Sequence, residues 1–177
     1  MRLYQNKYRT ENHRLKGWNY GSSGLYAITI CTKDKKHYFG SLNLANTDNE
    51  NSKVKKSLLG SKAEEFWCSI PQYHNFVLID EYIVMPNHLH GILAFDKMEN
   101  PSDNKLRFGA QKNNLAAIIR GYKAGVKKFA KEKNITFDWQ PEFYDRVIRN
   151  EDELKRFQQY IIDNPRDWIR DKYFNED

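Results

Sequence analysis

The sequence predicts an α+β fold in which helices cover an antiparallel sheet, and three observations lead to this prediction. Two strand-like runs, residues 76–85 and 88–95, are separated only by Pro86 and Asn87, which indicates a tight hairpin. Strand-like and helix-like segments follow one another in the order β-α-β-β-α-β-α. The length of 177 residues suits a single hydrophobic core. The expected fold is therefore the split βαβ, or ferredoxin-like, arrangement with one added C-terminal helix.

The first part of the chain divides into an arm and the start of the domain. Residues 1–24 are polar and basic and end in a Gly-Ser-Ser-Gly run, so we expect an N-terminal arm there and a single domain over residues 25–177. Residues 25–32, with the sequence LYAITICT, are rich in β-branched and aromatic side chains and predict the first strand. A polar loop rich in Asn and Lys follows, to about residue 56.

The first helix is expected to begin at Ser61. Glu64 follows three residues later, as in a capping box, and Pro71 marks the end of the helix. The hairpin of residues 76–85 and 88–95 comes next, and we expect it at the centre of the sheet.

A long helix follows, with Asn113 or Asn114 as its cap and an end near Lys133. Beside its apolar stripe the helix carries a second, basic stripe that has no acidic residue before Glu132. The basic stripe consists of Arg120, Lys123, Lys127 and Lys131. A charged face on a helix is usually a solvated surface, but this imbalance favours contacts with the phosphates of a nucleic acid.

The last helix is predicted after a strand at residues 143–148. Asn150 with Glu153 forms its capping signal. At 100° per residue, Tyr160 and Asn164 lie together at the edge of the apolar stripe, one turn apart. This helix can therefore present a phenol and an amide to the same point.

Composition limits the classes of protein that the chain can belong to. The formal net charge is +6 and the pI is about 9.2, which suits a polyanionic partner such as nucleic acid. The two cysteines, Cys31 and Cys68, form no CxxC pair, so neither a disulfide framework nor a zinc knuckle is indicated. The first residues lack the apolar core of a signal peptide, and no run is apolar enough to span a membrane. We expect a protein of the cytoplasm that does not associate with membranes.

Two histidines form the first candidate site. His88 and His90 flank Leu89 on a predicted strand, and the period of two directs both imidazoles to one face. Two core histidines satisfied by hydrogen bonds are the simpler interpretation, but burying a pair of imidazoles in a core is costly. The pattern therefore favours a shared metal ion.

The last helix offers the groups that this pair lacks. The side-chain carbonyl of Asn164 can complete the coordination of a cation that prefers oxygen ligands. Tyr160 is a weak nucleophile at neutral pH, because its ordinary pKa is near 10, unless a metal activates the electrophile. The metal site and the phenol therefore make one coherent constellation.

Several segments together resemble a known family. Residues 85–90 (MPNHLH) resemble the HUH motif of the Y1 transposases of the IS200/IS605 type, and residues 26–32 (YAITICT) resemble the first strand of that family. Residues 139–150 resemble the segment before its catalytic helix. Residues 160–165 (YIIDNP) resemble its nucleophile motif, in the form found in the REP-associated tyrosine transposases.

This resemblance implies an activity. His88, His90 and Asn164 would bind Mg²⁺ or Mn²⁺, and Tyr160 would attack a phosphate of single-stranded or hairpin DNA. The products would be a 5′-phosphotyrosyl link and a free 3′-OH, and the reverse attack would rejoin strands. The resemblance thus implies a transposase-like endonuclease for DNA transposition or recombination, working as a monomer or a homodimer.

Two alternatives remain open at this point. A ferredoxin-like module can bind nucleic acid without cutting it. A zinc hydrolase could also use His88 and His90, although the sequence offers neither an HExxH-like helix nor cysteine ligands for it.

Overall fold

The computed structural model describes residues 3–4, 7–8, 15, 17–42, 54–97, 113–170 and 173. Its strands are β1 (Leu3–Tyr4), β2 (Lys7–Tyr8), β3 (Gly24–Cys31), β4 (Gly40–Leu42), β5 (Val54–Lys56), β6 (Val77–Val84), β7 (His88–Phe95) and β8 (Tyr144–Ile148). Its helices are α1 (Leu58–Cys68), α2 (Ile70–Tyr73), α3 (Leu115–Glu132) and α4 (Glu151–Asp163), with 3₁₀ turns at Lys33–Lys35 and Trp168–Arg170.

Four strands form one antiparallel sheet in the order β6-β7-β3-β8. Numbered along the core of the fold, this is the order 2-3-1-4 of a split βαβ sheet, so the predicted α+β fold with an added C-terminal helix is confirmed. The β6-β7 hairpin is central only in part. β7 lies inside the sheet, whereas β6 forms an edge, because β3 rather than β6 pairs with both β7 and β8.

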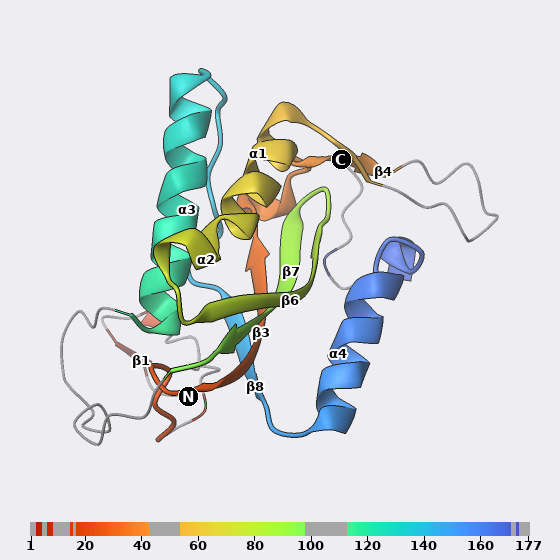
Figure 1. Ribbon diagram of the computed structural model, residues 1–177. Coiled ribbons are helices and arrows are strands. Elements are labelled where there is room, and N and C mark those ends of the chain that lie inside the picture. Colours follow the sequence, from red (N-terminus) through yellow and green to blue (C-terminus); the bar gives the residue numbers. More distant parts are fainter. Residues whose placement is uncertain are drawn as a thin grey trace.

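The sheet separates two layers. Figure 1 shows α1, α2 and α3 on one side of the sheet and α4 on the other. Successive side chains of β7 point alternately into the two layers. Leu89 and Leu93 belong to the large core under α1 and α3, whereas Ile92 belongs to a smaller core under α4. His88 and His90 share the parity of Ile92, so they face α4.

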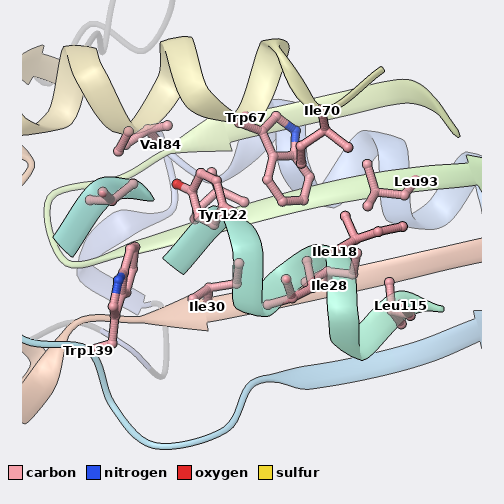
Figure 2. Packing of buried hydrophobic residues seen from close by; sticks show 14 of the residues in the cluster. Ile28, Ile30, Trp67, Ile70, Val84, Leu93, Leu115, Ile118, Tyr122 and Trp139 are labelled. Atoms are coloured by element: carbon pink, nitrogen blue, oxygen red, sulfur yellow. The ribbon is translucent and has the colours of Figure 1, made fainter. Parts of the chain in front are cut away.

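The large core holds α1 and α3 in contact with the sheet, as Figure 2 shows for its central residues. The Trp67 indole of α1 is fully buried, and the Tyr122 ring of α3 meets it edge-on at a centroid distance of 5.4 Å. Gly91 makes this packing possible, because a Cβ at that position would overlap the Trp67 ring. The glycine after His90 thus lets α1 lie close to the strand that carries both histidines.

The helix caps at Asn114 and Asn150 agree with the sequence, but the start of the first helix does not. α1 begins at Leu58, and its N-cap is Ser57 rather than Ser61, because the Ser57 hydroxyl accepts from the backbone N–H of Gly60 at 3.0 Å. The expected polar loop to about residue 56 contains the paired strands β4 and β5, with residues 43–53 outside the described part.

The end of the predicted arm is attached to the domain. The Trp18 indole N–H donates to the Tyr26 hydroxyl at 3.3 Å, and the backbone N–H of Leu115 donates to the Tyr20 carbonyl at 3.1 Å. The division into an arm and one domain stays a prediction. Among the described residues, no helix combines the length and the apolar character needed to cross a membrane.

Candidate active site

The two histidines of β7 lie side by side on the face that α4 covers. The ring centroids of His88 and His90 are 4.4 Å apart, with the planes inclined by 73°. Both side chains are buried, with exposed fractions of 0% and 4%. The sheet therefore presents two imidazoles to one point, as the alternation of a strand predicts.

Asn87 fixes the orientation and the tautomer of His88. Its side-chain NH₂ donates to the backbone carbonyls of Lys35 at 2.9 Å and Tyr173 at 2.8 Å, so its amide oxygen is the atom that faces His88. That oxygen lies 2.8 Å from His88 Nδ1 and can only accept a hydrogen bond. Nδ1 therefore carries the hydrogen, and in the neutral ring the lone pair is on Nε2.

His90 is held between a strand neighbour and α4. Thr29 of β3 is its direct partner across the sheet, and the Thr29 hydroxyl lies 2.8 Å from His90 Nδ1. On the other side of the ring, the Tyr160 hydroxyl lies 3.3 Å from His90 Nε2, and the two ring centroids are 5.1 Å apart. The phenol is thus in contact with His90.

The apolar stripe of α4 places Tyr160 there. Leu154, Phe157 and Ile161 pack on the smaller core, so Tyr160 comes to the edge of the buried face and keeps 42% of its surface exposed. A polar tether adds to this packing: the Gln158 side-chain NH₂ donates to both carboxylate oxygens of Asp80 on β6, at 2.8 and 3.1 Å.

Asn164 ends α4 and is buried, with 2% of its surface exposed. It lies four residues after Tyr160, which touches His90, and four residues before Trp168, whose ring centroid lies 5.7 Å from that of His88. Asn164 has helical backbone angles and follows Tyr160 by four residues, so its side chain leaves the helix on the same side as that of Tyr160.

A cavity of about 650 Å³ opens beside the histidines, between α4 and the edge strand β8. His90 and Tyr160 lie in its wall. Other polar and aromatic groups also line it, among which are Thr29, Tyr144, Asp145, Arg146, Glu153, Arg156 and Tyr173. The cavity therefore has room for a segment of a polymer chain next to Tyr160.

One carboxylate in this cavity, that of Glu153, already has partners within the protein. Glu153 accepts from the backbone N–H of Arg149 and from the Arg146 guanidinium, both at 2.9 Å. These two interactions, the backbone hydrogen bond first, hold the pKa of Glu153 below its usual value. Glu153 thereby joins β8 to the first turn of α4.

The basic stripe of α3 lies on the opposite side of the sheet from the histidines, and two of its four members are engaged within the protein. Lys123 Nζ donates to the carbonyls of Gln140 and Glu142, both at 2.7 Å, and burial lowers its pKa. Lys127 forms an ion pair with Asp138 at 2.9 Å. The other two, Arg120 and Lys131, are exposed. A nucleic-acid surface on this stripe stays a prediction.

The donors present suit a divalent cation with mixed nitrogen and oxygen ligands. The two imidazoles are adjacent, and the His88 tautomer directs a lone pair away from the Asn87 side. In the described part of the chain, no cluster contains three or more of His, Cys, Asp and Glu. Asn164 as a third ligand through its amide oxygen stays a prediction.

Comparison with known proteins finds a relative in sequence and similar solved structures, while no family model matches the chain. An uncharacterized protein of Haemophilus influenzae is 34% identical over 170 residues, which cover 91% of each chain. A REP-associated tyrosine transposase, solved bound to a REP hairpin, superposes with a TM-score of 0.53 and 16% identity over 91% of this chain and 76% of that one. At this identity the likeness concerns the fold.

Proposed function

Because the chain belongs to the same family as the uncharacterized Haemophilus influenzae protein and has the fold of a REP-associated tyrosine transposase, we propose that it is a transposase-like, metal-dependent nuclease. Its substrate is single-stranded or hairpin DNA. The observation that carries the proposal is the contact between Tyr160 and His90, at 3.3 Å, beside a second imidazole and an open cavity.

A bound Mg²⁺ or Mn²⁺ would withdraw charge from a phosphate oxygen and so make the phosphorus a better electrophile. His88 and His90 would hold the cation through nitrogen, and Asn164 through its amide oxygen. Asn87 and Thr29 keep the two imidazoles in place by their bonds to Nδ1, at 2.8 Å each.

Tyr160 supplies the nucleophile. Its hydroxyl oxygen forms a bond to phosphorus, and the bond from phosphorus to the 3′ oxygen of the neighbouring nucleotide breaks. The phenol proton passes to solvent, and the 3′ oxygen takes one from solvent. The product is a 5′-phosphotyrosyl link with a free 3′-OH, and attack by a 3′-OH on this link rejoins a strand.

The burial of other tyrosines supports this choice of nucleophile. Tyr122 lies on the opposite face of the sheet, has 5% of its surface exposed, and has a pKa raised chiefly by burial. Tyr144 and Tyr173 also line the cavity. Tyr144 is 39% exposed and Tyr173 only 6%, so Tyr144 is the more accessible alternative, which an experiment has to separate from Tyr160.

The test is covalent capture of DNA. The protein is incubated with Mn²⁺ and labelled hairpins that carry randomised single-stranded flanks, and adducts are resolved on a denaturing gel. We expect an adduct with the wild type, none with Tyr160→Phe, and an undiminished adduct with Tyr144→Phe. Tyr73→Phe is the matched control, because Tyr73 is exposed on α2, on the other side of the sheet.

Two results would contradict the proposal. An adduct that persists in Tyr160→Phe and disappears in Tyr144→Phe would move the nucleophile to β8. If the protein binds hairpins tightly but forms no adduct with any of several divalent cations, it is a nucleic-acid-binding module and not a nuclease.

A further inference from the structure

Arg156 occupies a distinctive place in the cavity beside Tyr160. It lies on α4, is exposed to solvent and lines the cavity. It precedes Tyr160 by four residues, so the two side chains leave the helix on the same side. A shift of four residues along an α-helix is about 6 Å, which is comparable to the spacing of neighbouring phosphates along an extended nucleic-acid strand.

Arg156 differs from Arg146, the other arginine of the cavity, in its interactions with acidic groups. Arg146 forms an ion pair with Glu153 at 2.9 Å and lies over the Phe157 ring, at 5.7 Å from its centroid. Glu153 is also used by the backbone N–H of Arg149. Within the described residues Arg156 forms no ion pair, so its guanidinium is available to an anion that enters the cavity.

Other cations of the described chain are less suited to this role. Lys123 is bound to two carbonyls, and Lys127 is paired with Asp138, on the opposite side of the sheet from Tyr160. Lys155, next to Arg156, is paired with Glu151 at 2.8 Å. A guanidinium can also hold a phosphate through two parallel hydrogen bonds, which an ammonium group cannot do.

We propose that Arg156 binds the backbone phosphate next to the one that Tyr160 attacks. This inference rests on the proposed function and adds a second point of attachment for the strand. With one phosphate held by Arg156, the strand enters the cavity in a fixed register relative to the phenol. Arg156 is thus a positioning residue for the reacting strand.

The first test measures binding of single-stranded oligo-dT as a function of salt. Arg156→Gln is compared with Lys155→Gln, since both variants lose one positive charge from neighbouring exposed positions of α4. We expect Arg156→Gln to bind several-fold more weakly at low salt and to reduce the slope of log K against log salt by about 0.7, the value for one contact with a single strand. Lys155→Gln should stay near the wild type. Equal losses in both variants would mean that only net charge matters, and would overturn the proposal.

The second test locates the phosphate. In a hairpin that forms the adduct, single phosphates around the cleavage point are replaced by neutral methylphosphonates. Replacement of the phosphate next to the cleaved one should weaken binding to the wild type several-fold and leave Arg156→Gln unaffected, because the variant has already lost that contact. A loss of the same size in both proteins would overturn the assignment.

The two proposals fail in different ways. If the wild type forms the adduct while Arg156→Gln and Lys155→Gln bind alike, the nuclease stands and the role of Arg156 falls. If no adduct forms but Arg156→Gln alone weakens binding, the protein is not a nuclease and Arg156 has no cleaved phosphate beside it. Arg156 would then be a phosphate-binding residue of a nucleic-acid-binding module.

Discussion

The Tyr160 hydroxyl lies 3.3 Å from Nε2 of His90, the nitrogen through which this histidine would hold a cation. Nε2 takes part either in a hydrogen bond with the phenol or in a bond to a metal, so the two interactions exclude each other. Cation binding at Nε2 would therefore release the phenol from His90, and the proposed nucleophile and the proposed metal site are linked through a single atom.

Tyr160→Phe should for this reason bind Mn²⁺ more tightly than the wild type, although it should form no adduct. Removing one competing hydrogen bond is worth about 1 kcal/mol, or roughly a fivefold lower Kd. Isothermal titration calorimetry of the variant, the wild type and Tyr73→Phe measures the difference. A weaker affinity in Tyr160→Phe would show that the phenol assists the cation instead of competing with it.

Thr29→Val tests the support of His90 from the sheet. The substitution keeps the shape of the side chain but removes the hydroxyl that lies 2.8 Å from His90 Nδ1. Loss of such an outer contact typically lowers metal affinity about tenfold or more. We expect that loss for Mn²⁺ by calorimetry, with a thermal unfolding midpoint close to that of the wild type in the absence of metal. An unchanged Mn²⁺ affinity would mean that Thr29 does not orient the ring.

Local patterns were enough to predict much of the candidate site. The alternation of β7 put His88 and His90 on one face, and the 100° step of α4 put Tyr160 at the edge of its apolar stripe. Both inferences use only neighbours in sequence. The structure adds the distance between the two elements, which depends on the small core around Ile92 and Ile161.

Features that depend on distant pairing were not predictable in this way. Arg146 reaches the cavity because β8 pairs with β3 in the register that sets it opposite Ala27. The basic stripe of α3 looked unpaired because its partners come from a later loop: Asp138 binds Lys127, and two carbonyls of the same loop bind Lys123. Helical spacing contains no information about either contact.

Gly91→Ala should destabilise the domain. A methyl group at this position overlaps the buried Trp67 ring, and overpacking of this kind costs about 1–3 kcal/mol. Gly121→Ala is the matched control, because Gly121 is exposed in the middle of α3 and a Cβ there meets nothing within 4 Å. We expect this control to be more stable than the wild type by about 0.5–1 kcal/mol. Chemical denaturation measures both, and a Gly91→Ala variant as stable as the wild type would mean that α1 can shift away from β7.

Glu153 should make stability depend on pH in the acid range. Its folded-state pKa lies below the usual value of 4.5. A depressed carboxyl pKa contributes stability that is fully present above the unfolded-state pKa and is lost as the pH falls through the folded-state pKa. The melting temperature of the wild type should therefore exceed that of Glu153→Gln at neutral pH, and the two should converge as the medium is acidified. A difference that stays constant with pH would mean that the carboxylate charge plays no part.

The tether between Gln158 and Asp80 should set how precisely Tyr160 is positioned. This contact joins α4 to the edge strand β6, on the side of the helix away from the cavity, and its loss should cost about 1 kcal/mol because the carboxylate is charged but only partly buried. In Gln158→Ala we expect faster hydrogen exchange of the α4 amides and slower adduct formation. Gln159→Ala is the matched control: the Gln159 side chain donates to Asp163 within the same helix, at 2.9 Å, so its removal leaves the attachment of α4 to the sheet intact. If Gln158→Ala and Gln159→Ala exchange and react alike, packing of the apolar stripe alone positions the helix, and the tether has no role in presenting the phenol.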